Sequence, residues 1–432
     1  MRDYIDMFRK AVQAVRNDYV GYERKRELDQ PNYLMNRLAM DILEGCGPET
    51  CFTNSMDLYL AGLRDPGLEL LVDSEPAGFA RFSRGFSVRE FEGALYVDEV
   101  FGEERVAPGD LVFELEHLSY TTLLARYRTW IDRPDAQARP WNAVVKTAHE
   151  VGVRHADGSE EQLRMTRFAP LPERWPNEVE VAPGGAQVVL RLGDFDDVEG
   201  LWGVVEGARD AIAGAQRLAI DLRTCTGDAL EGLGAVVPYV IDRAVALGDY
   251  VPAAYTCRYT PRNSAYQIAQ VRALRAQVGD DAAACRVLDE LAAEYRARRK
   301  DGYVLVEPDA AADGAEADAE VFEPAACAAE VVVLIDVTCR GAGELVARIA
   351  NDCGRARTVG RATAGALEYF GFVELELDPG YTLRYPTCAY TQSAGFAQGV
   401  GVVPAVAVPW SPEAPTPQAD LARLLRTPEE AR

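Results

Sequence analysis

The sequence lacks long apolar runs and has few basic residues. Charged side chains from Arg2 to Lys10 interrupt its start, which excludes the apolar core of a signal peptide and a membrane-spanning segment there. We therefore expect a cytoplasmic protein with no membrane partner. The 45 Lys and Arg residues stand against 68 Asp and Glu, and this net charge of −23 would repel the phosphates of a nucleic acid.

The sequence also has few histidines and no closely spaced pairs of cysteines. Only His117, His149 and His155 occur, and the nine cysteines are an odd number without any C-x-x-C spacing. Neither a zinc ribbon nor an H-E-x-x-H helix can be drawn from them. We expect no metal and no cofactor, and we interpret the cysteines as reduced thiols.

The length and the apolar pattern predict several globular domains. A chain of 432 residues exceeds what one core usually serves, and its 48% hydrophobic content is typical of globular proteins. Residues 1–75 are predicted to be a helical domain, because apolar residues recur at helical spacing from Phe8 to Tyr19. Short β-like runs with interspersed glycine predict a small β-rich domain over 76–180.

An α/β core is predicted over residues 181–412. The runs QVVLRL at 187–192 and LAIDLR at 218–223 flank a helical stretch, and VVVLID at 331–336 starts a second strand-helix-strand unit. Such continuous β-branched runs are typical of parallel strands that are buried on both faces.

Two segments interrupt or follow this core. Helical patterns within 260–300 predict a helical insertion, and the acidic stretch at 307–323 is interpreted as a solvated loop. Residues 413–432 are expected to form a C-terminal tail. The predicted fold class is therefore α/β, with an open mixed sheet as its core.

Four short stretches carry a family resemblance. They are APGDLVFELEHLS at 107–119, AIDLRTCTG at 219–227, VVVLIDVTCRGAGELVARIANDCGRARTVGRATAGA at 331–366 and GVGVVPAVAVP at 399–409. In this order they resemble the PDZ-like module, the Asp-Leu-Arg strand, the nucleophile strand and helix, and the closing strand of the tail-specific (C-terminal-processing) serine proteases. The resemblance implies a crotonase-like α/β core behind a helical N-terminal domain and a PDZ-like domain, and a partner that is a peptide or a protein C-terminal segment.

The family's catalytic residues are missing from the matching positions. Its Ser-Ala-Ser-Glu motif falls on residues 341–344, so that Gly341 stands at the nucleophile, and its lysine, 25 positions further on, falls on Ala366. The histidine that some members use as a base would fall within 65–67, where the chain reads Asp-Pro-Gly. The resemblance therefore implies a catalytically degenerate member.

The segment that should stabilise an oxyanion differs as well. The family's Asn-Gly-Gly-Gly becomes Thr-Cys-Thr-Gly-Asp at 224–228, which places the negative charge of Asp228 where preorganised donors are needed. We expect the former active cleft to persist as a binding site. The residues expected to line it are Thr224, Gly227, Ala342, Thr363 and Gly365.

Three functions stay open at this point. The first is a non-proteolytic protein that binds a peptide or a protein tail in the cleft. The second is an active hydrolase in which Cys339, two residues before Gly341, serves as a relocated nucleophile, with Ser393 as a weaker candidate. The third is a carrier of an apolar small molecule, and a homo-oligomer is left open for all three.

Overall fold

The computed structural model describes residues 2–45, 47–73, 82–169, 175–279, 281–307, 320–391 and 399–426. The chain forms two compact units that are each built from separate stretches of sequence. The first comprises residues 1–80, 252–313 and 368–396, and the second comprises residues 81–251, 314–367 and 397–432. The division into domains at 1–75, 76–180 and 181–412 stays a prediction beside this description.

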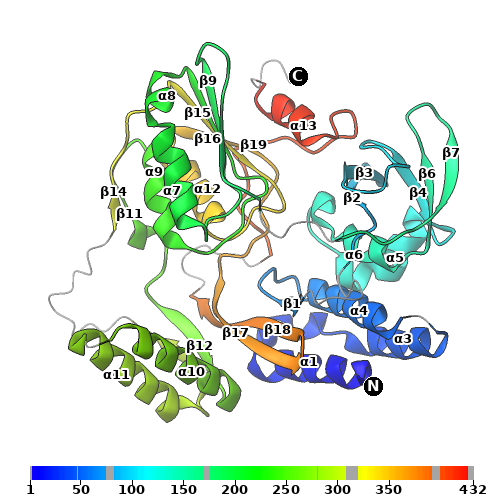
Figure 1. Cartoon of the computed structure of the whole chain (residues 1–432), viewed down its shortest axis with the longest axis horizontal. Coiled ribbons are helices and arrows are strands. Elements are labelled where there is room, and N and C mark those ends of the chain that lie inside the picture. Colours follow the sequence, from blue (N-terminus) through cyan, green and yellow to red (C-terminus); the bar gives the residue numbers. More distant parts are fainter. Residues whose placement is uncertain are drawn as a thin grey trace. The chain divides into compact units, whose positions relative to one another are not determined.

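The first unit joins the N-terminal helices to a five-stranded sheet (Figure 1). Its helices are α1 (Tyr4–Asp18), α2 (Tyr22–Lys25), η1 (Arg26–Leu28), α3 (Pro31–Leu43), α4 (Pro48–Gly62), α10 (Pro261–Gln277) and α11 (Ala282–Arg298). Its strands are β1 (Glu69–Val72), β12 (Tyr255–Tyr259), β13 (Gly302–Val306), β17 (Tyr369–Asp378) and β18 (Tyr381–Tyr390). The strand order is β1-β18-β12-β13, with β17 paired to β18.

Local signals in the sequence explain several of these elements. Proline occupies the first turn of α3, α4 and α10, where its missing N–H costs nothing. Gly380 takes a positive φ of 84° at the turn between β17 and β18, a conformation that glycine adopts readily. The helical insertion expected within 260–300 corresponds to α10 and α11.

One cysteine pair corrects the interpretation of all nine cysteines as reduced thiols. Cys257 of β12 and Cys388 of β18 lie directly opposite each other in the antiparallel ladder and form a disulfide. They are 131 residues apart, so cysteine spacing gave no signal of this pairing. Among the described residues, Cys225, Cys285, Cys327, Cys339 and Cys353 are free thiols.

The second unit begins with a β-rich part. It contains β2 (Phe86–Phe91), β3 (Ala94–Val100), β4 (Leu111–Leu115), β5 (Leu118–Ser119), α5 (Tyr120–Ile131), η2 (Ala136–Ala138), α6 (Trp141–Thr147), β6 (Glu150–Arg154) and β7 (Glu160–Arg164). The strands form one antiparallel sheet in the order β2-β3-β4-β6-β7, with β5 paired to β4.

An α/β part completes this unit. It contains β8 (Glu178–Val181), β9 (Gln187–Arg191), α7 (Val198–Gly207), α8 (Arg209–Gly214), β10 (Arg217–Asp221), η3 (Leu230–Gly232), α9 (Leu233–Val240), β11 (Val245–Ala246), η4 (Leu247–Asp249), β14 (Val321–Phe322), β15 (Glu330–Ile335), α12 (Ala342–Cys353), β16 (Ala356–Gly360), β19 (Val406–Ala407) and α13 (Pro417–Leu424). The six-stranded sheet has the order β19-β16-β15-β10-β9-β8. All neighbours are parallel except β8 and β9, so the sheet is mixed, and the predicted α/β fold class is confirmed.

The central strands of this sheet are buried on both faces, as their continuous apolar runs predict. One face packs against α7, α9 and α12 in a large apolar core, and the other contributes Val332 and Leu334 to a smaller core with Leu421 and Leu424 of α13. Of the acidic stretch at 307–323, residues 308–319 lie outside the described residues, and Val321–Phe322 pair with β11.

Candidate functional site

The candidate site lies in the second unit, where parallel strands β10, β15 and β16 end. Ligands in open α/β sheets bind outside the carboxyl ends of the strands. The loop after β10 holds Thr224 and Gly227, the loop after β15 holds Cys339 and Gly341, and the segment after β16 holds Thr363 to Ala366. The structure thus brings the residues expected from the sequence to one edge of the sheet.

Gly341 precedes α12 in a conformation that favours glycine. Its φ is 67° and its ψ is −135°, outside the regions that residues with a side chain adopt at low cost. A Cβ atom built at this position would lie 2.1 Å from the carbonyl oxygen of Gly227 and 2.6 Å from Oδ1 of Asp228. The site therefore has no room for a serine side chain without a change of the backbone.

The loops after β10 and β15 are joined by hydrogen bonds. The backbone N–H of Ala342 donates to the carbonyl oxygen of Gly227 at 3.0 Å, and that of Arg340 donates to the carbonyl of Cys225 at 3.0 Å. The hydroxyl of Thr338 donates to the carbonyl of Arg223. The N–H of Ala342, the first residue of α12, is therefore engaged within the protein and is not presented to a ligand.

Glu344 holds the segment that carries Ala366. Its fully buried carboxylate accepts hydrogen bonds from the backbone N–H groups of Gly365 and Ala366, each at 2.7 Å, and from the hydroxyl of Thr363. Burial raises the pKa of Glu344, and these donors oppose the rise. Sequence reasoning did not single out this residue, although an acid inside the apolar run of α12 is a signal for a buried polar contact.

Cys339 is a buried thiol and does not have the features of a nucleophile. It is fully buried, and burial, followed by its contact with Cys225, raises the pKa of its thiol well above the ordinary value. A thiolate is the reactive form, so this environment disfavours reactivity. A Cβ at Gly343 would lie 2.5 Å from Sγ of Cys225 and 3.2 Å from Sγ of Cys339, so the glycine makes room for the two thiols.

An ion-pair network, which the sequence did not reveal, lies beside these loops. Asp336, after β15, pairs with Arg89 of β2 at 2.9 Å, and Arg361, after β16, pairs with Asp420 of α13 at 2.5 Å. Arg223 also pairs with Asp420, at 2.9 Å. Burial alone would raise the pKa of Asp336, but the charges of Arg89 and Arg361 hold it below its ordinary value.

The other sequence candidates lie apart from this site or outside the description. Asp65 belongs to the first unit, where it accepts the hydroxyl of Tyr19 at 2.5 Å, and Ser393 lies outside the described residues. His155 contacts Asp110 at 2.9 Å in the β-rich part. Among the described residues, no three His, Cys, Asp or Glu side chains are grouped as metal ligands, and no helix is long and apolar enough to cross a bilayer.

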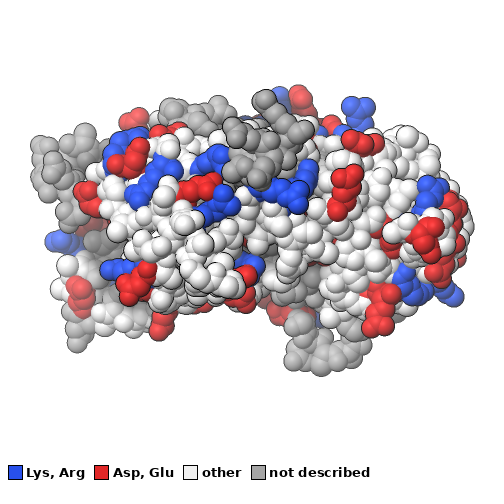
Figure 2. All heavy atoms as spheres, turned by 90° about the horizontal axis from the view of Figure 1, so that it is seen from above, with Lys and Arg blue, Asp and Glu red and all other residues white. Residues whose placement is uncertain are grey.

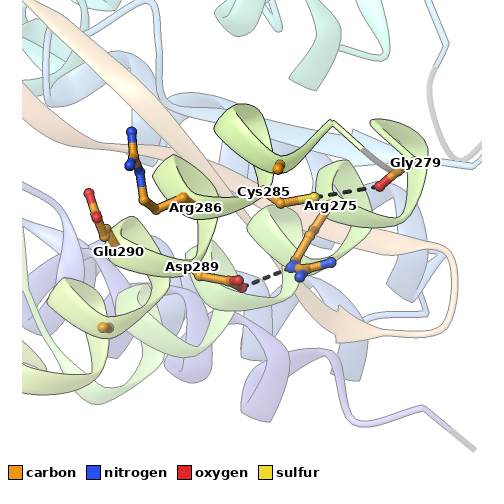
Figure 3. A pocket seen from close by; sticks show the side chains of 8 residues that line it. Arg275, Gly279, Cys285, Arg286, Asp289 and Glu290 are labelled. Carbon is orange, nitrogen blue, oxygen red and sulfur yellow. Dashed lines mark hydrogen bonds and ion pairs between the residues drawn. The ribbon is translucent and has the colours of Figure 1, made fainter.

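A separate hollow of about 660 Å³ lies on the α10–α11 hairpin of the first unit. Figure 3 shows the side chains of Asp289 and Arg275 directed toward each other and the thiol of Cys285 directed toward the carbonyl of Gly279. The lining also includes Arg286 and the small residues Ala282 and Ala293, so charged and apolar groups are mixed in it.

Comparisons with known proteins agree with this fold. The model of peptidase family S41 matches residues 189–408, which is just over half of the chain. The solved structure of mature CPAF complexed with lactacystin has a TM-score of 0.56 at 12% identity, covering 95% of this chain and 94% of that one. A second structure of mature CPAF has a TM-score of 0.55 at 12% identity, covering 95% and 93%. No curated protein matches the sequence.

Proposed function

We propose that this chain, which belongs to peptidase family S41, binds an extended peptide or protein tail at the site around Gly341 without cleaving it. The observation that carries the proposal is the backbone of Gly341, whose φ of 67° and close approach to Gly227 exclude a serine side chain. A hydrolase of this kind needs a nucleophile with a base within hydrogen-bond reach. Ala366, at the position of the base, supplies no such group.

The engaged donor at Ala342 also supports this proposal. Acyl transfer requires free donors directed at the developing oxyanion, and one such donor contributes about 3–4 kcal/mol to catalysis. Here the N–H of Ala342 is bonded to the carbonyl of Gly227, and Asp228 adds a negative charge nearby. Such a site favours binding over stabilisation of a tetrahedral intermediate.

Peptidases act on peptides and proteins, and sheet edges capture extended peptides by backbone pairing. We propose that the β-rich part at residues 82–169 is a PDZ-like module that contributes to this capture. Of the expected binding residues, Thr363 and Gly365 donate hydrogen bonds to Glu344, and Thr224 lies on the loop after β10.

The other functions receive less support. The burial of Cys339 and its raised pKa oppose a relocated thiol nucleophile. For an apolar carrier, no observation on the described residues specifically favours an apolar ligand in the cleft around Gly341.

The proposal is tested with activity probes and binding in parallel. Purified protein is treated with a fluorophosphonate serine-hydrolase probe and an iodoacetamide thiol probe, and it is incubated with unstructured and C-terminally tagged fluorogenic peptides. A heat-denatured sample and the Cys339→Ala variant serve as controls. We expect no labelling by the fluorophosphonate and no hydrolysis above the denatured control, together with saturable peptide binding in fluorescence anisotropy.

Two outcomes would contradict this function. Hydrolysis by the native protein that the denatured sample lacks would establish an enzyme, and its loss in Cys339→Ala would identify the nucleophile. The absence of binding to every peptide tested would remove the binding role.

A further inference from the structure

The outer edge of β8 is a sheet edge with backbone groups that an additional strand can pair with. β8 is the last strand of the six-stranded sheet, and within the described part of the chain it pairs with β9 alone. All four of its residues are exposed. It contains no lysine, proline or bulge, and Glu178 and Glu180 are its only charged side chains against pairing.

The register defines which backbone groups face outward. The N–H of Ala182 donates to the carbonyl of Gln187 at 2.9 Å, which makes these two residues a hydrogen-bonded pair. Hydrogen-bonded pairs alternate along an antiparallel ladder, so Glu180 and Glu178 also bond toward β9. The N–H and C=O groups of Val179 and Val181 consequently point away from β9, at the alternate spacing that an added strand requires.

The two faces of β8 differ in chemistry. Val179 and Val181, which are 41% and 47% exposed, lie opposite Leu190 and Val188 and so extend the apolar face of the sheet to its edge. Glu178 and Glu180 lie on the other face. Glu180 forms an ion pair with Arg191 at 2.7 Å and keeps 61% of its side chain exposed, so its carboxylate is accessible to a second cation.

Two side-chain hydrogen bonds fix Asn177, the residue that precedes β8. The amide side chain of Asn177 donates to the carbonyl of Asp194 at 2.8 Å and accepts the N–H of Asp194 at 3.1 Å. This double contact fixes the strand before any partner arrives, so less ordering entropy is lost on pairing.

We infer that the outer edge of β8 accepts a strand from a peptide or protein tail in which aliphatic residues alternate with lysine or arginine. The aliphatic residues would extend the row of Val179 and Val181, and the basic residues would face Glu178 and Glu180. The inference rests on the proposed function and names the partner class of a peptide-binding protein. A second copy of this chain fits less well, because every register that pairs both valines with valines places Glu opposite Glu.

The test uses defined peptides and two matched variants. A fluorescent octapeptide of alternating Lys and Val is compared in anisotropy with the same composition in two blocks and with an alternating Glu and Val peptide. Val179→Pro removes an outward N–H without touching the ladder to β9, and Val179→Thr retains that N–H. Equal circular dichroism and Tm identify Val179→Pro as folded.

We expect the alternating basic peptide to bind more tightly than both comparison peptides. Val179→Pro should weaken its binding by about fivefold, the value of one hydrogen bond, while Val179→Thr stays within about twofold. Glu178→Gln/Glu180→Gln should weaken binding and reduce its dependence on salt, and it tests the inference even if Val179→Pro does not fold.

Three results would overturn the inference. The first is equal affinity for the alternating and block peptides. The second is unchanged binding by Val179→Pro and by the double glutamine variant, in which case peptide binding elsewhere would leave the proposed function intact. The third is a dimer in light scattering that Val179→Pro dissociates, since the edge would then pair with a second copy.

Discussion

Position 341 carries two separate obstacles to a serine, one in the backbone and one in the surrounding atoms. A residue with a side chain at a positive φ costs about 1–3 kcal/mol, and the carbonyl oxygen of Gly227 occupies the place of a Cβ. We expect Gly341→Ser to lower the Tm by several degrees and to produce no hydrolysis. Differential scanning fluorimetry and the fluorophosphonate probe measure the two effects.

Gly203 provides a matched control for this substitution. It is exposed in α7, and a Cβ there would meet no atom within 4 Å. Gly203→Ser should therefore change the Tm by less than Gly341→Ser. A Gly341→Ser protein that is as stable as the parent and reacts with the probe would show that only the hydroxyl had been lost.

The sequence predicts those features of the site that lie within one continuous segment. Gly341 and Ala366 could be assigned to the nucleophile and base positions because the motifs around them resemble a known family. The contacts that shape the site join distant residues, such as Glu344 with Gly365 and Ala366. No periodicity or spacing indicates such a contact, since it depends on how the loops after β15 and β16 meet.

At the scale of the element, α13 is held to the sheet by Asp420. This buried carboxylate pairs with Arg361 and Arg223, while Leu421 and Leu424 enter the smaller core. Removing one member of a buried pair costs about 3–5 kcal/mol where the other charge is left uncompensated. Arg361 and Arg223 keep Asp336 and Asp221 as partners at 3.5 and 2.8 Å, so we expect a smaller cost here. Asp420→Ala should therefore lower the Tm and expose the bond after Arg423 to trypsin.

The exposed pair of Arg275 and Asp289 supplies the control for this prediction. Asp289 keeps 60% of its side chain exposed, and surface pairs contribute about 0–1 kcal/mol. Asp289→Ala should leave the Tm and the trypsin pattern nearly unchanged. If Asp420→Ala behaves in the same way, the buried network does not anchor α13.

A pH-dependent contact joins the end of β6 to the turn before β4. The hydrogen bond with Asp110 raises the pKa of His155 above its ordinary value. A raised pKa in the folded state stabilises the protein below about pH 6.5, and this contribution is lost as the pH rises through the raised pKa. The Tm difference between wild type and His155→Gln should thus be largest near pH 5.5 and shrink by pH 8.5. In an Asp110→Asn background the same substitution should give a smaller pH dependence, because Asp157 and Glu161 also raise the pKa of His155.

Elements with a strong local pattern were predictable, and those defined by their partners were not. The apolar runs of β9, β10, β15 and β16 and the helical spacing in α1 correspond to elements in the structure. The short acidic β8 has alternation but no large apolar residue, and its role as an antiparallel edge follows only from its place beside β9. The pairing of Cys257 with Cys388 likewise depends on the order of β12 and β18 in their sheet.

Two features belong to the scale of the whole molecule: the distribution of charge over its surface and the order in which the chain builds its two units. Figure 2 shows acidic and basic side chains interspersed over the face in view, so the net charge of −23 does not appear there as one continuous acidic area. A local recognition surface such as β8 then depends on the arrangement of a few carboxylates. The chain passes repeatedly between its two units, and the first unit, like the second, is assembled from three separate stretches.

The disulfide crosslinks two of these three stretches and should control the stability of the first unit. Closing a loop of about 130 residues restricts the unfolded chain and stabilises the folded protein by about 3–5 kcal/mol.

Reduction of the disulfide should therefore speed hydrogen exchange in β12 and β18 and leave exchange in β10 and β15 of the second unit unchanged. The mass of the intact protein with and without reductant reports whether the disulfide is present. Hydrogen-exchange mass spectrometry then measures the exchange rates of these strands. Cys257→Ser/Cys388→Ser should exchange at the reduced rate under both conditions, and Cys285→Ser should respond as the parent does. Free thiols at Cys257 and Cys388 in the untreated protein would contradict the crosslink.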